Sequence, residues 1–486
     1  MTYHGAKMLV AGPSRLPFQH LALRLDARAP ACSAEACRCL HSAGKATFAA
    51  RRALRIDRQD PPSYRRLNSS VSTTSALDLP VDGARRRVGA EAKEEGRSEE
   101  EQRAYDRLRP IIDALPGPVD WAVAYGSGVR HQANTDPTGP PPMTDFLLST
   151  PDLAQFHTAN LRQNPSHYPL TARLLGGGRI AWLTDRWGAG VWYVTMVKIR
   201  GLEVKYGVIS TERLKRDLEG WETLYVAGRL HKPVLPLITP PEISESLRTN
   251  LHSALTLSLL LLPPTFTEQA LWTQIAGISY AGDPRMSVPG AEHPDKVANI
   301  VKGKGALEGM RGLYGQFMGR GELALVWDRG EKRVEEPEVG KGWTWRGTGE
   351  EVLRQPDTSD HLASLIMSLP CNLRTRILRT YHAETDPGIV RTNTVEGTPS
   401  SASPERNLLL DIVGRKAISE AESAKGQVGD WRKVVLTEVA NIIRRPALTQ
   451  SFKGLFTAGF RKSFVYAMAK FRKWLNARRA KGGKAA

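Results

Sequence analysis

The stretch AVAYGSGVRHQANTDPTGPPPMTDFLLST, residues 122–150, constrains the fold more than any other part of this 486-residue chain. Its two apolar ends, separated by a Pro-rich loop, predict two half-buried strands. The first strand ends in Gly126-Ser127-Gly128, where glycines permit a sharp turn and let backbone N–H groups approach an anion. The second contains Asp145, a carboxylate that is costly to bury without a cation or metal. Together these features indicate a phosphate cradle beside a metal ligand.

The flanking sequence predicts further strands and helices of a mixed region. VWYVTMVKI (191–199) and LEVKYGVIS (202–210) have strand patterns, and DLAQFHTANLRQN (152–164) has a helical one. TERLKRDLEGWETLYVAGRL (211–230) predicts a single helix with Thr211 as its N-cap. Its apolar residues would share one helix face; they are Leu214, Leu218, Trp221, Leu224 and Tyr225.

The region from Pro240 to about Arg374 is predicted to be mainly helical, with a Gly- and Trp-rich interruption at 330–349. The apolar run 251–266 is broken by Pro263-Pro264 after roughly a dozen residues, whereas a membrane span needs about 20. We therefore expect a buried core helix there. TVEGTPSSASPE (394–405) has the composition of a surface loop.

Positive charge is concentrated at the two ends of the chain. The formal net charge is +18, of which residues 1–66 contribute +8 and residues 451–486 contribute +10. The segment between them is close to neutral. Because a nucleic-acid enzyme usually carries its positive field around a central groove, this distribution argues against a nucleic-acid partner.

The N-terminal segment is rich in Arg and Ala, poor in acids and punctuated by Ser, which is typical of a mitochondrial presequence. A basic extension without a targeting role is the alternative. Cys32, Cys37 and Cys39 lie in this segment, and Cys371 stands alone in the body. That spacing favours neither a disulfide framework nor a structural zinc site.

A glycine–serine turn followed by an acid on the next strand resembles the layout of polymerase-β-type nucleotidyltransferases. The surrounding motifs are more specific, and they occur in the order YGSGV, TDF, FHTANLRQNPSHYP, VKYGVIS, LYVAGRLHKPV, SYAGDPRM, HPDKVANIV and KGLFTAGFRKSFVYA. Together they resemble the mitochondrial phosphatidate cytidylyltransferase family, the translocator assembly and maintenance type of CDP-diacylglycerol synthase. The resemblance runs from roughly Arg109 to Trp474.

This resemblance implies an α+β fold, with a polymerase-β-type nucleotidyltransferase domain, a mainly helical second domain and a C-terminal amphipathic helix. It implies Mg²⁺-dependent transfer of CMP from CTP to phosphatidic acid, giving CDP-diacylglycerol and pyrophosphate for cardiolipin synthesis. The expected location is the matrix side of the mitochondrial inner membrane, as a peripheral protein.

The resemblance also assigns candidate site residues. Asp145 is the expected metal ligand and, with Ser127 and Lys205, a catalytic residue. The expected nucleotide and phosphate contacts are Gly126, Ser127, Gly128, Lys205, Tyr206, Arg229 and Lys232. The alternatives are a strand-edge role for Lys205 and, for the basic trio of Arg229, His231 and Lys232, complementation of a helix dipole.

The sequence offers several candidates for the second metal ligand and more than one role for the other polar residues. Polymerase-β-type sites usually place a second carboxylate two residues after the first, but Leu147 occupies that position. Asp152, Asp185 and Glu203 are candidates for the second ligand. We interpret His157, Asn160, Asn164 and His167 mainly as structural hydrogen-bonding groups. Asp283 and Arg285 could form a local pair or reach the active cleft.

The C-terminal segment FRKSFVYAMAKFRKWLNARRAK predicts an amphipathic helix on a membrane surface. Apolar side chains recur near helical spacing, and basic residues fill much of the remainder without any acid. The expected contacts with anionic inner-membrane lipids are Phe460, Lys462, Phe464, Phe471, Lys473 and Trp474. The alternative is an amphipathic helix packed on the body.

We therefore expect five segments: a presequence or basic tail (1–66), a charged linker (67–104), a nucleotidyltransferase domain (105–240), a mainly helical domain (241–450) and a membrane-binding helix (451–486). Two rival functions remain. One is a nucleotidyltransferase with an RNA or protein acceptor, and the other is a non-catalytic matrix scaffold supporting the protein-import machinery.

Overall fold

The computed structural model describes residues 97–126, 128–129, 143–287, 295–319, 323–327, 334–335, 344–345, 347–385, 409–410, 412–413, 431–458 and 468. These residues belong to one compact unit, Arg85–Ala486. The predicted presequence, most of the predicted linker and the loop at 394–405 lie outside the described residues.

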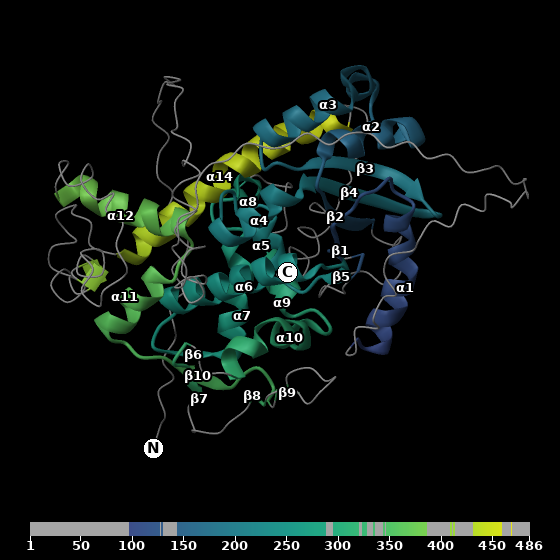
Figure 1. The fold of residues 1–486 in the computed structure, drawn as a ribbon. Coiled ribbons are helices and arrows are strands. Elements are labelled where there is room, and N and C mark those ends of the chain that lie inside the picture. The colour runs from purple at the N-terminus through teal and green to yellow at the C-terminus, as the bar shows by residue number, and fades with distance from the viewer. Residues whose placement is uncertain are drawn as a thin grey trace, which may run out of the picture. The chain divides into compact units, whose positions relative to one another are not determined.

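The first half of the described chain contains a five-stranded mixed sheet (Figure 1). Its strand order is β3-β4-β2-β1-β5, and all neighbours are antiparallel except β2 and β4, which are parallel. The strands are β1 (Trp121–Tyr125), β2 (Thr144–Thr150), β3 (Trp192–Ile199), β4 (Leu202–Ser210) and β5 (Leu235–Ile238). The four strands expected from the sequence pattern are thus confirmed as β1 to β4.

One face of this sheet is covered by the helices that precede and connect its first strands. They are α1 (Glu99–Asp113), α2 (Leu153–Gln163), the 3₁₀ turn η2 (Pro165–His167) and α3 (Leu170–Arg186). Apolar side chains of these helices, among them Ile111, Phe156 and Ile180, share a core with Phe146 and Val208 of the sheet. The predicted helix at 152–164 is confirmed as α2. The last residues of the predicted linker belong to α1, which begins with a Ser98 capping box.

The opposite face packs on the helical half of the chain. The elements there are α4 (Thr211–Gly220), α5 (Ala227–Leu230), α6 (Pro241–Leu261), α7 (Glu268–Ile278), α8 (Pro284–Ser287), α9 (Lys296–Val301), α10 (Ala306–Gly319), α11 (Ser359–Met367), α12 (Cys371–Thr385) and α14 (Trp431–Ala458). Short strands accompany them: β6 (Thr265–Thr267), β7 (Val326–Trp327), β8 (Val334–Glu335), β9 (Thr344–Trp345) and β10 (Val352–Arg354). Mixed helix and sheet content confirms the α+β class.

One hydrophobic core runs across the expected boundary at residues 240/241. Trp121 and Val123 of β1 belong to the same cluster of buried side chains as Leu255 of α6 and Trp272 of α7. The part of the apolar run from 251 to 261 forms the buried half of α6, which confirms the predicted core helix, and the run then passes through Pro263-Pro264 into β6. Within the described residues, no helix is long and apolar enough to cross a membrane.

The predicted single helix at 211–230 is wrong, because the chain forms two helices there. Ser210, rather than Thr211, is the N-cap of α4, and its hydroxyl accepts a hydrogen bond from the Arg213 N–H. The helix stops after Gly220 because Trp221 adopts a left-handed conformation, with φ +54°. Trp221 still fills the core, with none of its surface exposed.

Candidate active site

The turn after β1 and the beginnings of β2 and β4 lie at one edge of the sheet. This follows from the topology, because β1 runs antiparallel to β2 while β4 runs parallel to it. The register pairs Tyr125 with Asp145 and Asp145 with Lys205. Since directly paired residues project to the same face of a sheet, their three side chains lie side by side. Three segments that are distant in sequence thus contribute to one site.

Asp145 and Lys205 form an ion pair at the centre of this row. The Asp145 Oδ1 and Lys205 Nζ atoms are 3.3 Å apart, and each side chain is about one quarter exposed. The Lys205 Nζ atom also lies 4.6 Å from the ring centre of Tyr193 on β3. Apart from this ion pair, the buried Oδ1 atom of Asp145 has no hydrogen-bond partner in the described part of the chain. The carboxylate therefore has remaining capacity to bind a cation.

The glycine turn approaches this carboxylate closely. Gly126 has φ +83°, a conformation that favours glycine, and a Cβ atom there would lie 3.2 Å from Asp145 Oδ2. The Val129 N–H donates to the Gly126 carbonyl oxygen at 3.1 Å, which closes the turn. Gly128 lies within this turn. Ser127 lies outside the described residues, so its role stays a prediction.

A buried aspartate on α4 shapes the loop that carries further cations to the site. The Asp217 Oδ1 atom accepts hydrogen bonds from the Thr223 N–H and hydroxyl and the Leu224 N–H, and Oδ2 accepts from the Val226 and Ala227 N–H groups. These five bonds at 2.8–3.0 Å fix the entry into α5. Sequence reasoning missed Asp217, although an acid one turn before a helix-terminating Gly-Trp pair is a usable signal.

Arg229 on α5 is held against an aromatic ring from this loop. Its guanidinium lies 3.8 Å from the ring centre of Tyr225 and donates to the Tyr225 carbonyl oxygen. Burial by itself would raise the pKa of Tyr225, but the positive charges of Arg229, Arg285 and Lys205 outweigh it and lower the pKa below the ordinary value. Three cations from different elements therefore act on one phenol.

The pKa of Tyr125 shifts in the opposite direction, upward, because of burial and, in part, the Asp145 carboxylate. Its pKa is raised by burial first and by the charge of Asp145 second, while Lys205 and Arg229 oppose the shift. The field of Arg229 thus reaches both Tyr125 and Tyr225. Tyr125 and Tyr225 therefore belong to the same site as Asp145 and these cations. The sequence pattern had predicted neither of them as a site residue.

Lys232 lies one turn beyond Arg229 and is also drawn into this charged region. Its Nζ atom donates to the Gly228 carbonyl oxygen at 2.6 Å and the Ser279 hydroxyl at 2.7 Å. Burial, followed by the charges of Arg229 and Lys296, lowers the pKa of Lys232 to about 7. A lysine destabilised in its charged form gains most from the arrival of an anion.

Arg285 forms the local pair that the sequence left open. Its Nη2 atom lies 2.6 Å from Oδ2 of the buried Asp283. Burial opposes ionisation of Asp283, but Arg285 outweighs it and lowers the pKa of the carboxyl. Since Arg285 also acts on Tyr225, the pair is both local and directed toward the site.

Tyr206 is the predicted site residue that the structure does not bring to this cluster. It follows Lys205 on β4, so its side chain projects to the opposite face of the sheet. Its hydroxyl accepts from Asn160 Nδ2 at 2.7 Å and hydrogen-bonds with His167 Nδ1 at 2.8 Å. A phosphate contact does not fit this placement. The structural role expected for His157, Asn160, Asn164 and His167 agrees with their hydrogen bonds beneath the sheet.

His231 also lies away from the charged cluster, although it stands between Arg229 and Lys232 in sequence. It is fully buried, and its Nε2 atom lies 3.0 Å from Asn250 Oδ1. Burial, with a smaller effect of Lys232, lowers the pKa of His231 to about 3. His231 is therefore a neutral core residue.

Two candidates for a second metal ligand lie at the wrong end of the strands. Asp152 follows β2 and accepts hydrogen bonds from the Ala154 and Gln155 N–H groups as the N-cap of α2. The Asp185 carbonyl oxygen accepts from Arg213, just beyond the end of β4. Glu203 is exposed on β4 two positions before Lys205, so it projects to the same face as Lys205.

Among the described residues, no three His, Cys, Asp or Glu side chains gather in a way that could hold a metal ion. A single carboxylate with an acceptor atom that lacks a hydrogen bond instead fits Mg²⁺, which commonly uses one or two carboxylates together with substrate phosphates.

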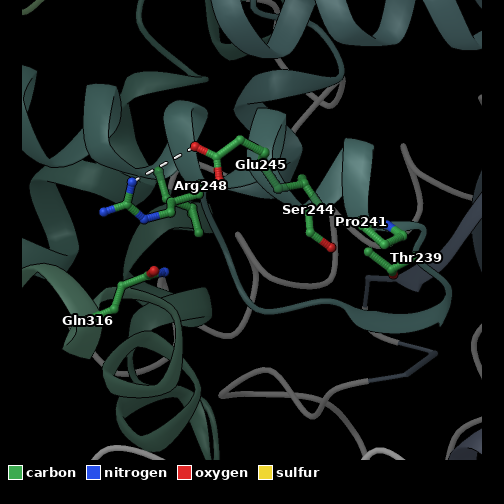
Figure 2. Close-up of a pocket in the computed structure, with 8 residues that line it drawn as sticks. Thr239, Pro241, Ser244, Glu245, Arg248 and Gln316 are labelled. Carbon is green, nitrogen blue, oxygen red and sulfur yellow. Dashed lines mark ion pairs between the residues drawn. The ribbon is translucent and has the colours of Figure 1, made fainter. Parts of the chain in front are cut away.

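A separate pocket lies elsewhere in the described part of the chain. It encloses about 610 Å³ between the start of α6 and Gln316 on α10, with Thr239, Ser244 and Arg248 on its wall (Figure 2). Glu245 and Arg248, three residues apart on α6, form an ion pair on its wall at 3.9 Å. Thr239 follows β5, at the sheet edge opposite the β1 turn. The pocket is thus distinct from the Asp145 site.

The membrane contacts predicted from Phe460 to Trp474 lie outside the described residues. Within that range the structure describes Met468 alone, which is exposed. The last described helix before it, α14, ends at Ala458.

Residues 108–473 match the model of a family described as "Phosphatidate cytidylyltransferase, mitochondrial". Curated proteins with that name are similar over most of their length. The protein from Schizosaccharomyces pombe is 34% identical over 384 residues, covering 79% of this chain and 87% of the relative. The proteins from Xenopus laevis (34%) and Caenorhabditis elegans (32%) each match 77% of this chain, and 96% and 100% of their own lengths.

Proposed function

This chain belongs to the mitochondrial phosphatidate cytidylyltransferase family, and we propose that it transfers CMP from CTP to phosphatidate. The products are CDP-diacylglycerol and pyrophosphate, and the proposed use is cardiolipin synthesis. The observation that carries this proposal is the Asp145–Lys205 ion pair beside the glycine turn, facing Arg229 and its neighbouring cations.

The reaction needs alignment and charge neutralisation more than an activated side chain. A phosphate oxygen of phosphatidate forms a bond to the α-phosphorus of CTP, and the bond from that phosphorus to the bridging oxygen of pyrophosphate breaks. The attacking group is already an anion at neutral pH, so no base has to remove a proton. The protein must bring two anions together and stabilise the charge that is shared in the transition state.

The residues of this site suit those tasks. Backbone N–H groups of the turn at Gly126–Gly128 would bind the CTP phosphates, and Lys205, oriented by Asp145, would contact the transferred group. Asp145 would hold Mg²⁺ jointly with the phosphates. That ion would supply charge neutralisation across the attacking and leaving oxygens. Arg229, Lys232 and Arg285 would then bind the remaining phosphate charge.

We also propose a polymerase-β-type nucleotidyltransferase arrangement for the sheet, and a peripheral location on the matrix side of the mitochondrial inner membrane. The strand order supports the first, because it brings a glycine turn and a strand carboxylate to one edge. The names of the relatives, which include the word mitochondrial, support the second in part.

The direct test is incubation of the purified chain with labelled CTP, Mg²⁺ and phosphatidate in vesicles. Formation of lipid-soluble labelled product together with equimolar pyrophosphate is the expected result. Parallel reactions with RNA or a protein mixture as acceptor test the rival transferase. A well-folded chain that labels none of these acceptors would support the scaffold interpretation.

A further inference from the structure

Large apolar side chains are exposed on both parts of α3, which is kinked at Gly176. Leu170, Leu174 and Trp182 are 73%, 85% and 57% exposed, and Trp187, directly after the helix, is 36% exposed. Arg179, Trp182 and Arg186 follow helical spacing on the second half of α3, where all three are exposed. The Arg186 guanidinium lies 5.4 Å from the ring centre of Trp182.

The C-terminal half of α14 presents a second stripe of the same kind. Arg444, Leu448 and Phe452 stand four residues apart and therefore share one helix face. All three are exposed, and Phe452 is 60% exposed. One acid, Asp185, is exposed within the α3 stripe, three residues after Trp182, and the three α14 positions carry none.

Polar contacts hold the two helices together. The buried Lys453 amine donates to the Trp187 carbonyl oxygen at 3.1 Å and lies 3.4 Å from that of Thr184, at the end of α3. The Gln450 side chain accepts from the Ala189 N–H and donates to the Val191 carbonyl oxygen. Figure 1 shows α14 reaching α3 at its C-terminal end. Phe452 and Trp187 are therefore brought into the same neighbourhood.

We propose that these two stripes form one lipid-docking surface, the α3/α14 surface, which binds an anionic bilayer through Trp182, Trp187, Leu448, Phe452 and the arginines Arg179, Arg186 and Arg444. The inference rests on the proposed function in one respect: a phosphatidate acceptor requires the enzyme to work at a bilayer. It adds a docking surface within the folded body, separate from the predicted helix after residue 459.

Charge and composition favour a bilayer over a protein partner. Tryptophan is enriched at the water–lipid boundary, and exposed arginines are attracted to an anionic surface. Against the single exposed acid Asp185, the two stripes present three exposed arginines, Arg179, Arg186 and Arg444. The chain also continues from α14 into residues 459–486, which hold nine Lys or Arg and no acid. A surface that ends where such a segment begins is well placed to share its membrane.

The experiment uses the full chain and vesicles of phosphatidylcholine with phosphatidylglycerol, an anionic lipid that is not the acceptor. Trp182→Ala/Phe452→Ala removes apolar side chains, whereas Arg179→Glu/Arg186→Glu reverses exposed charges. We expect each double variant to lower vesicle affinity about tenfold. Val326→Ala is the control, because that residue is an exposed apolar side chain on β7, outside both helices, and the variant should bind like the unmodified chain.

Unchanged vesicle affinity in both double variants, or an equal loss in the control, overturns the proposal. If the apolar variant melts early, the charge variant still decides, since it alters exposed side chains only. A change from dimer to monomer with unchanged vesicle binding would assign the surface to a second copy instead. Activity on short-chain phosphatidate dispersed in detergent should persist in every variant. Its absence from the unmodified chain would refute the proposed function and leave the vesicle result standing.

Discussion

The two faces of the five-stranded sheet differ in chemistry although the same strands build both. On the face covered by α2, the polar side chains His157, Asn160 and Tyr206 are at most 1% exposed and hydrogen-bond within the core. On the other face, at the active-site edge, Asp145 and Lys205 stay partly exposed. One face therefore buries its polar groups and pairs most of them internally, while the other leaves polar groups able to bind a ligand.

Lys205 and Tyr206 show how sharply the two faces are separated. They are neighbours in sequence, yet the period of two along β4 sends one to the charged cluster and the other into the hydrogen-bonded core. Within the motif VKYG, Lys205 is thus placed to serve the active site, whereas Tyr206 serves the stability of the core. We therefore expect substitutions on the active-site face to change activity and substitutions on the hydrogen-bonded face to change stability.

The largest effect is expected for Asp145→Asn. Loss of the proposed metal ligand should lower kcat/KM by at least about 10³-fold, about 4 kcal/mol of transition-state stabilisation. The melting temperature should change little, because the carboxylate is at the sheet edge. Product formation and thermal unfolding measure the two outcomes.

Asp152→Asn is the matched control, since Asp152 lies beyond the other end of β2. Asparagine also caps helices well, so activity and stability should both be retained. Near-normal turnover in folded Asp145→Asn would remove the carboxylate from the mechanism.

Substituting the two neighbouring residues of β4 one at a time should have separate effects on activity and on stability. Lys205→Met should lower kcat/KM about 100-fold, because a phosphate contact is lost. The unfolding free energy should change little. Tyr206→Phe should lower the unfolding free energy by about 1–3 kcal/mol, because Asn160 loses its acceptor in the core. Initial rates and denaturant unfolding decide the matter. Equal catalytic losses in both variants would mean that the faces are not independent.

Acid should destabilise the fold through His157 on the hydrogen-bonded face. Burial, with a smaller effect of Lys453, lowers the pKa of His157 to about 3, below the unfolded value of 6.5. Its neutral form therefore stabilises the fold fully above pH 6.5, and this stability is lost as pH falls from 6.5 toward 3. Between pH 7 and 5 the cost is about 2 kcal/mol.

His157→Gln keeps a group that can hydrogen-bond to Tyr168 and should reduce this pH dependence, which denaturant unfolding at several pH values would measure. His231, whose pKa is also lowered to about 3, supplies a similar dependence that the variant leaves in place. An unchanged slope in His157→Gln would show that His157 is protonated or exposed in the native state.

The smallest effect concerns the turn. Gly126→Ala should cost about 1–2 kcal/mol of stability through its positive φ and lower CTP affinity about tenfold, since its Cβ would crowd Asp145. Gly201→Ala has the same φ of +83° with nothing near its Cβ, so it should cause the strain without the affinity loss. Matching losses of CTP affinity in both variants would exclude a local role for the turn.

The sequence predicted the strands and the Asp145 turn because both depend on local patterns: alternation of apolar residues and the conformations open to glycine. It did not predict the break after Gly220, because the left-handed Trp221 depends on a core that packs its ring and on Asp217 accepting hydrogen bonds from the N–H groups of the loop that follows. Nor did it find Tyr125 or Tyr225, since a tyrosine becomes a site residue only when packing brings cations to it. Ser127 and the helix after residue 459 stay predictions.

The single parallel pairing in the sheet also governs when the site can form. Asp145 and Lys205 are sixty residues apart, and a parallel pair requires a crossover, supplied here by α2, η2, α3 and β3. Loop-closure entropy therefore has to be overcome before the two side chains meet. On a ribosome, the site cannot form until β4 has emerged, well after β1 and β2 are able to pair. Recovery of catalytic competence would then be a late event in folding, later than the appearance of secondary structure.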